Sequence, residues 1–213
     1  MLFIVFEYSA LIRDSLSLST GICERIFRQD YHKVALKKVI VQTSERNRGR
    51  GIDRVLSVSN VKGFVDQREQ FEDRVIASED ISNYKVVRVN DFAYNPARIN
   101  VGSIARLSSF SEGIVSPMYL CFRCSSEIDP AYLECYFETP LFNAEVEKRL
   151  EGSVRMCLSF EGLCSIPVPL PEPVAQRRIV KEINAITMKV ALEQKILDFY
   201  MLQKQSLLKG MFI

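Results

Sequence analysis

The pattern of apolar and polar positions divides the chain into three zones. Residues 1–32 form a lead-in without clear periodicity, in which Glu7 interrupts the short apolar run Met1–Phe6. Residues 33–166 contain short apolar segments separated by turn residues, as is typical of strands. The predicted strands are Val39–Gln42, Val55–Val58, Tyr84–Val89, Gly113–Phe122 and Cys164–Val168, and the predicted helices are Pro130–Glu138 and Pro140–Leu150. This irregular order of strands and helices indicates an α+β (mixed α/β) globular domain.

A run of alternating prolines, from Pro167 to Pro173, follows this zone. Proline disfavours both a helix and a central strand, because it lacks the amide hydrogen and fixes φ. We therefore expect residues 167–173 to form an extended connector after a domain of residues 33–166.

The third zone, residues 174–213, predicts one long helix. It contains no proline and only one glycine, Gly210, and apolar residues recur mostly at steps of four and three. At 1.5 Å per residue the helix would extend ~55 Å, more than a domain of this size needs for itself. A second apolar stripe runs through Leu192, Ile196 and Phe199. We expect a coiled coil or helix bundle with a partner, and packing back on the chain's own core is the alternative. The predicted dimer or partner interface comprises Ile179, Ile183, Ile186, Val190, Leu197, Tyr200, Leu207 and Met211.

Composition narrows the chemistry that the chain can perform. The net charge is only +2, so a nucleic-acid interface must come from local patches rather than from overall basicity. The single histidine, His32, excludes sites built on several histidines, and Cys121-x-x-Cys124 has no second closely spaced pair to complete a zinc site. We therefore expect neither a metal nor another cofactor. Six irregularly spaced cysteines without an export signal indicate free thiols in a reducing cytoplasm, and the sequence predicts no membrane span.

Two segments carry side chains suited to DNA contact. The first is a glycine-containing loop with Arg46, Arg48, Arg50 and Arg54, whose alternative interpretation is a solvated charged loop. The second is FAYNPARINVGSIA, residues 92–105, in which arginine and asparagine offer the geometry that reads guanine and adenine edges. A plain turn at Tyr94-Asn95 is the alternative there. The predicted DNA-contacting residues are Arg46, Arg48, Arg50, Arg54, Lys62, Tyr94, Arg98, Asn100, Ser103, Arg106 and Arg155.

Catalytic motifs are missing from this sequence. Tyr94-Asn95-Pro96 is similar to the catalytic loop of adenine methyltransferases, but Ala97 and Arg98 follow where that loop has a second proline and an aromatic residue. The sequence also lacks a glycine-rich loop for S-adenosylmethionine, a phosphate-binding loop and a carboxylate cluster for nuclease metals. We therefore expect a non-catalytic protein.

An ordered set of segments resembles the specificity (S) subunits of type I restriction–modification systems. The resemblance is carried by LSVSNVKGF (56–64), NYKVVRVNDFAYNPARINVGSIA (83–105), EGIVSPMYLCF (112–122), Tyr132-Leu133 with Tyr136-Phe137, GSVRMCLSFEGL (152–163), IPVPLPEP (166–173), Gln176-Arg177-Arg178-Ile179-Val180 and the terminal stretch from Lys204 to Phe212. It covers most of residues 55–180 and does not extend to residues 1–32.

The resemblance implies a target-recognition domain that reads double-stranded DNA for a methyltransferase subunit and, through it, a restriction subunit. Family members typically carry two such domains, each followed by a helix, whereas this sequence shows one such unit and no internal repeat. It therefore resembles a half-subunit, which would pair with a second copy of itself and read a symmetric split target. A protein-interaction module with a coiled-coil tail and no DNA reading is the alternative, and a free-standing nuclease or methyltransferase is a remoter one.

Overall fold

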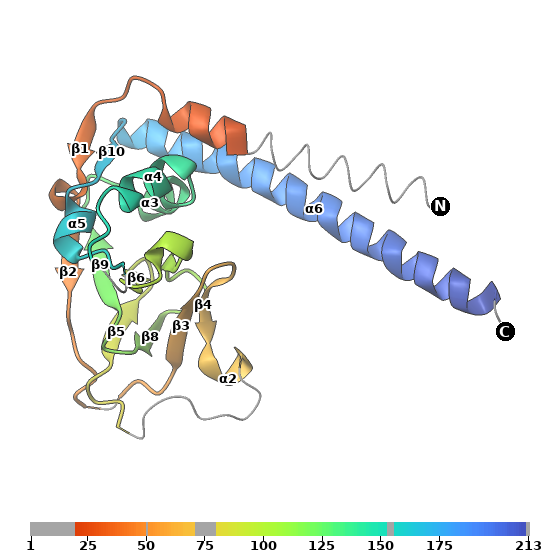
Figure 1. The fold of residues 1–213 in the computed structure, drawn as a ribbon, viewed down its shortest axis with the longest axis horizontal. Coiled ribbons are helices and arrows are strands. Elements are labelled where there is room, and N and C mark those ends of the chain that lie inside the picture. The colour runs from red at the N-terminus through yellow and green to blue at the C-terminus, as the bar shows by residue number, and fades with distance from the viewer. Residues whose placement is uncertain (1–19, 50, 71–79, 153–155, 212–213) are drawn as a thin grey trace. The chain divides into compact units, whose positions relative to one another are not determined.

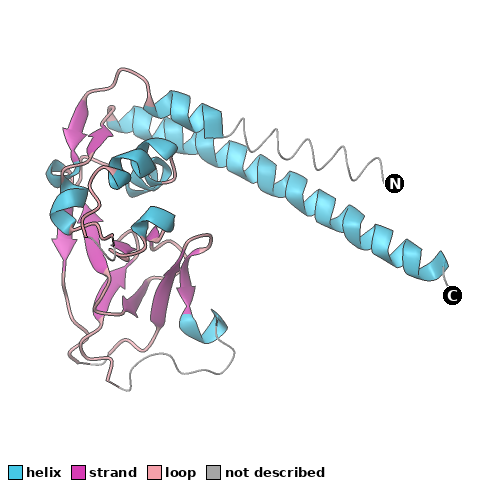
Figure 2. Ribbon diagram, viewed as in Figure 1, coloured by secondary structure: helices cyan, strands magenta, loops and turns pink. Residues whose placement is uncertain are grey.

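The structure is a computed structural model that describes residues 20–49, 51–70, 80–152 and 156–211. The chain divides into two compact units, one of residues 30–177 and one of the two terminal segments, 1–29 and 178–213. Figure 1 shows the order of the elements, and Figure 2 separates helices from strands. The mixed α/β class predicted from the sequence is confirmed, and so is the long C-terminal helix.

The described part of the larger unit contains two four-stranded sheets. The first has the order β2 (Ile40–Thr43), β9 (Leu120–Cys124), β6 (Phe92–Tyr94) and β7 (Ile104–Arg106), and all its pairs are antiparallel. The second has the order β4 (Gly63–Asp66), β3 (Val55–Ser59), β8 (Glu112–Val115) and β5 (Lys85–Arg88), in which β3 and β8 are parallel. The short helix α2 (Gln67–Gln70) follows β4.

One apolar cluster draws buried side chains from both sheets. Leu56 and Val87 come from the second sheet, whereas Ala93 and Cys121 come from the first. Aromatic rings of the first sheet also contact the helices, because Phe92 stacks on Phe122 at 5.0 Å and meets Phe137 edge-on at 5.6 Å. These contacts join the sheets and the helices into one core.

The helices α3 (Pro130–Phe137) and α4 (Pro140–Glu147) begin where the prolines predict. Asp129 caps α3 by accepting hydrogen bonds from the amides of Ala131 and Tyr132, and Thr139 caps α4 through the amide of Phe142. Each helix ends before its predicted last residue. The described elements also include η1 (Leu36–Lys38), η2 (Ile99–Val101) and α5 (Phe160–Cys164).

The proline-rich segment is extended, as predicted, but it is not a connector. Pro167–Pro169 forms strand β10, which pairs antiparallel with β1 (Lys33–Ala35). The two prolines have no amide hydrogen to donate, but their carbonyl oxygens accept hydrogen bonds from helix α3. The hydroxyl groups of Tyr132 and Tyr136 donate to the carbonyl oxygens of Pro169 and Pro167, both at 2.8 Å. The predicted boundary at 167–173 thus lies inside the larger unit, which continues to residue 177.

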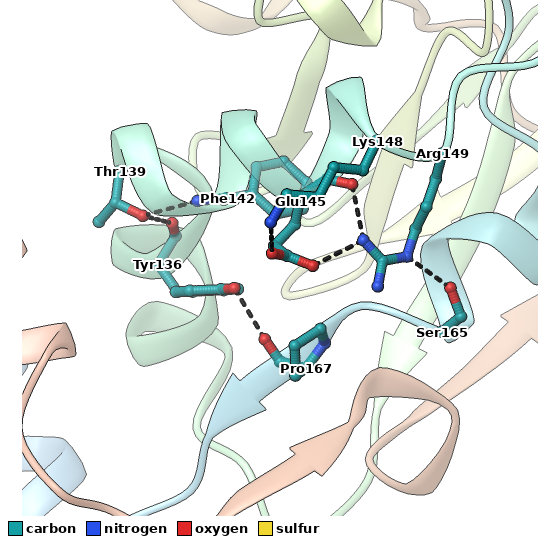
Figure 3. A network of polar contacts seen from close by, with 8 residues as sticks. All are labelled: Tyr136, Thr139, Phe142, Glu145, Lys148, Arg149, Ser165 and Pro167. Atoms are coloured by element: carbon teal, nitrogen blue, oxygen red, sulfur yellow. Dashed lines mark hydrogen bonds and ion pairs between the residues drawn. The ribbon is translucent and has the colours of Figure 1, made fainter.

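A polar network joins the end of α4 to Ser165, at the end of α5 (Figure 3). Arg149 donates to the Glu145 carboxylate at 2.6 Å and to the Ser165 hydroxyl at 2.7 Å. Lys148 also donates to Glu145, at 2.6 Å, and these two cations hold the pKa of that carboxyl below its ordinary value. These contacts tie the end of α4 to Ser165, the C-cap residue of α5.

The first turn of α6 (Pro173–Met211) is anchored in the larger unit by Gln176. This side chain is buried, its Oε1 accepts from the amide of Asp129 at 2.7 Å, and its Nε2 donates to the carbonyl oxygens of Glu127 and Pro171. Nearly all of its hydrogen-bonding capacity is therefore used within the domain.

Two predicted strands have a different form in the structure. Gly113–Phe122 is two strands, β8 and β9, separated by a turn in which the amide of Tyr119 donates to the carbonyl oxygen of Ser116. Cys164–Val168 contains the end of α5 and the start of β10. No described helix is long and apolar enough to cross a membrane.

Candidate nucleic-acid interface

The loop of residues 95–102, between β6 and β7, presents two of the predicted DNA-contacting side chains. Asn95 Oδ1 accepts from the amide of Ala97 at 3.1 Å, and buried Ile99 anchors the following turn. Gly102 closes the turn with a φ of 88°, a conformation that favours glycine. Arg98 and Asn100 are consequently exposed, and their side chains have no hydrogen-bond or ion-pair partner among the described residues.

The turn between β3 and β4 lies next to this loop. Ser59 Oγ accepts from the amides of Val61 and Lys62, both at 3.3 Å, which shapes the turn. A methyl group placed on Gly102 would lie 3.6 Å from the Asn60 carbonyl oxygen, so the two turns are in contact. Val61 is 91% exposed at the tip, beside exposed Lys62.

A hollow of about 450 Å³ opens beside residues 95–102. It is lined by Asn95, Ala97, Arg98, Asn100, Met118 and Met156. Met118 and Met156 are exposed, and the described residues of the lining include one cation and no carboxylate. Sequence reasoning missed both methionines, because an isolated methionine in a loop gives no pattern that distinguishes an exposed side chain from a core one.

Arg106 lies in a separate groove of about 610 Å³, which Lys62 also lines. Its guanidinium donates through Nε to Glu134 at 2.8 Å and through Nη1 to Asn90 Oδ1 at 2.8 Å, and its Nη2 lies 2.7 Å from Glu134. All three guanidinium nitrogens thus serve the fold. We therefore assign Arg106 to holding β7 against α3 rather than to DNA.

The arginines of the loop between β2 and β3 also differ in whether they have a partner in the protein. Arg46 donates to the carbonyl oxygen of Asn83 at 2.6 Å, and Arg54 pairs with Asp66 at 3.6 Å while lying over the Phe110 ring. Arg48 is exposed and has no side-chain partner among the described residues.

Two other residues for which the sequence predicted DNA contact are buried in the structure. Tyr94 is fully buried, and its hydroxyl donates to the carbonyl oxygen of Leu158 at 3.2 Å. Burial raises the pKa of this hydroxyl, which keeps it a donor. Ser103 is only 2% exposed. Arg50 and Arg155 lie outside the described residues, so their predictions stay predictions.

The two thiols of Cys121-x-x-Cys124 lie in strand β9. Burial raises the pKa of both thiols to about 12. The described residues contain no group of three or more metal-ligating side chains.

The side chains of α6 that were predicted to contact a partner differ in exposure. Ile179 and Ile183 are buried. Ile186, Val190, Leu197 and Tyr200 are partly buried, Leu207 is 48% exposed, and the side chain of Met211 lies outside the described residues. The exposed face instead carries Met188, Leu192, Phe199 and Leu202, which include two members of the second apolar stripe.

Neither a family model nor a curated protein matches the sequence. Solved structures do match the fold. They include the HsdS subunit from Thermoanaerobacter tengcongensis, with a TM-score of 0.61, 16% identity, and coverage of 91% of this chain and 48% of that one. A chain from a structural study of type I R-M complex assembly has a TM-score of 0.66, 16% identity and coverage of 97% and 53%. The type I restriction–modification S subunit from M. genitalium has a TM-score of 0.59, 15% identity and coverage of 98% and 57%.

At these identities the likeness shows the fold. The chain spans about half the length of the solved structures that it matches. It has the fold of type I restriction–modification specificity subunits, over about half of such a subunit.

Proposed function

We propose that this chain is a non-catalytic DNA-specificity subunit of a type I restriction–modification complex and that it reads one half of a split target. The observation that carries the proposal is the structural likeness to S subunits, which extends over 91–98% of the chain. The surface around residues 95–102 supports it, because this surface concentrates unpaired cationic and amide side chains.

These side chains suit the two kinds of contact that sequence-specific binding needs. Lysine and arginine bind phosphates and set the position of a protein on the duplex, whereas base edges provide the sequence information. We assign Lys62 to phosphates, together with exposed Arg48, which lies in the separate loop between β2 and β3. Arg98 and Asn100 are assigned to base edges, since a guanidinium can bind guanine O6 and N7 and an asparagine amide can bind adenine N6 and N7.

The exposed face of α6 supports a partner role for the helix. Residues 176–213 contain seven Lys or Arg and three Asp or Glu, so the helix combines an apolar stripe with net positive charge. We propose that it contacts a methyltransferase subunit, through which a restriction subunit is recruited. We further propose that a second copy of the chain completes the recognition unit, so that the target has identical, inverted half-sites.

Methylation mapping tests this proposal. The full chain is co-expressed with a type I methyltransferase subunit from the same organism, and methylated adenines are mapped across the host genome. We expect one bipartite target with inverted identical halves. A target with two unrelated halves would contradict the symmetric dimer but leave DNA specificity intact.

Matched variants separate reading from assembly in the same experiment. The Arg98→Ala/Asn100→Ala protein should still assemble but should methylate a relaxed target. The Leu192→Glu/Phe199→Glu protein should fold but lose methylation, because charged side chains oppose an apolar interface. Absence of duplex binding even at low salt would instead favour the protein-interaction alternative.

A further inference from the structure

We propose that Met118 and Met156 read the C5-methyl group of thymine next to a base contacted by Arg98 or Asn100. This inference rests on the proposed DNA-reading function and names a substrate feature, a thymine methyl group in the major groove. The site is the hollow of about 450 Å³ beside residues 95–102.

The fold brings the two methionines to this hollow from separate segments. Strand β9 pairs with β6 in a register that places Leu120 opposite Tyr94. Met118 precedes Leu120 by two residues and Pro96 follows Tyr94 by two, so both lie at the same end of the strand pair. On the other side, the amide of Leu158 donates to the carbonyl oxygen of Pro96 at 3.0 Å, which ties the segment after Met156 to the loop.

Exposure of these side chains requires an explanation. Met118 is 60% exposed and Met156 is 47% exposed, although a methionine gains free energy by burial. Two exposed methionines that border one hollow together with an arginine and an asparagine form a mixed apolar and polar surface. Because methionine is unbranched and flexible, it can follow the outline of a ligand.

The charge and hydrogen-bonding capacity of the hollow favour DNA over an apolar partner. Among the described residues, its lining contains the Arg98 guanidinium and no carboxylate, which favours an anionic molecule. The side chains of Arg98 and Asn100 are unpaired among the described residues, whereas Asn95 Oδ1 is occupied by its own loop. Donors that are free in the protein are available for base edges.

The major groove supplies a matching ligand. An A·T pair presents adenine N6 and N7 to an amide and the thymine methyl group to an apolar side chain on the same groove edge. A methionine beside Asn100 or Arg98 therefore adds contact with thymine where cytosine or uracil offers no methyl group. The expected contribution of one methyl group, about 0.8 kcal/mol on burial, corresponds to about a fourfold change in affinity.

Uracil substitution tests the inference directly. A target duplex is first selected from random DNA with the full chain, and each thymine is then replaced by uracil, which removes only the methyl group. We expect wild-type binding to weaken about three- to tenfold at one or two thymines. The Met118→Ala and Met156→Ala proteins should bind the thymine duplex more weakly and no longer distinguish it from the uracil duplex at the corresponding position.

The control is Val89→Ala, which truncates an exposed apolar residue outside the hollow and should keep the full thymine preference. Met118→Gln and Met156→Gln keep the side-chain length and should also lose the preference, which separates methyl contact from packing. Uniform tolerance of uracil, or methionine variants that retain the thymine preference, would overturn this inference. Failure to select any sequence would overturn the proposed function instead.

Discussion

The arginines of the larger unit fall into two sets with different surroundings. Four of them hold the domain together through protein oxygen atoms: Arg88, Arg106, Arg123 and Arg149. Arg48 and Arg98 are exposed and have no side-chain partner among the described residues. The comparison indicates that pairing with protein oxygen atoms, rather than membership of a basic cluster, separates structural cations from candidate DNA contacts.

The first set gives the largest expected effect on stability. Arg123 donates to both carboxylate oxygens of Asp91, at 2.8 and 3.0 Å, and the Asp91 side chain is only 3% exposed. Arg123→Ala should lower the free energy of unfolding by about 3 kcal/mol, because it removes two charged hydrogen bonds from the buried Asp91 carboxylate, which then keeps only the amide of Arg88 as a donor. Urea denaturation measures the change. Arg123→Lys keeps the charge but not the paired geometry, so its free energy of unfolding should lie between those of wild type and Arg123→Ala. An unchanged urea midpoint in Arg123→Ala would contradict the assignment of Arg123 to the structural set.

Arg106 provides the sharpest test of the division, since the sequence predicted a DNA contact for it. Arg106→Ala should lower the free energy of unfolding by about 2 kcal/mol through loss of the Glu134 contacts. Thermal unfolding measures this loss, and DNA titrations below the transition should show unchanged base preference. If stability were unaffected and the preference relaxed at one base pair, Arg106 would belong to the second set.

Arg98→Ala should change base preference and leave stability nearly unchanged, the opposite of Arg106→Ala. We expect the free energy of unfolding to stay within about 0.5 kcal/mol, because the side chain has no partner to lose. Discrimination at one base pair should fall by about 1.5 kcal/mol, measured by titration against single-base variants of the target. Equal weakening for every sequence would instead make Arg98 a phosphate contact.

Lys62→Ala should weaken binding to all duplexes alike, by about fivefold, or about 1 kcal/mol. The slope of the logarithm of affinity against the logarithm of salt concentration should fall by about 1, because one phosphate contact is lost. A titration series from low to high salt provides the measurement. An unchanged slope would remove Lys62 from the phosphate set.

The pair of Glu45 and Arg88 should contribute least, because both side chains are about half exposed. The Arg88 hydrogen bonds lower the pKa of Glu45 below its ordinary value. The folded state therefore gains stability above the pKa of the unfolded chain, about 4.3, and loses it as the pH falls through the folded pKa. Glu45→Gln should cost less than about 1 kcal/mol at pH 7, and the difference from wild type should vanish at lower pH. Urea denaturation of wild type and Glu45→Gln at pH 7 and at pH 3 measures the difference in free energy of unfolding. A larger difference at pH 3 than at pH 7 would contradict this account.

Short sequence motifs predicted where the helices α3 and α4 begin, but not how the strands pair. Asp129-Pro130 and Thr139-Pro140 each contain a cap and a proline in adjacent positions, so the starts of α3 and α4 were readable from a few residues. Strands β6 and β7 have three residues each, too few for a period to emerge. The proline pattern predicted an extended segment, but the pairing of β10 with β1 depends on residues far away in the sequence.

The role of each arginine could not be predicted from its neighbours in the sequence, because its partner is far away along the chain. Arg123 and Asp91 are 32 residues apart, and Arg106 and Glu134 are 28 residues apart, so only the folded chain brings them together. Tyr94 lies in the segment most suggestive of DNA contact, yet the pairing of β6 with both β7 and β9 places it in the core. Met118 and Met156 became candidates only when their exposure was known.

Comparison of affinity for a selected target duplex with affinity for a shuffled duplex of equal length tests the central claim most directly. Both measurements use the full chain at the same salt concentration, so that the phosphate contribution is matched. We predict binding to the target at least about 10³-fold tighter than to the shuffled duplex. Equal affinity for the two duplexes would contradict a DNA-specificity role.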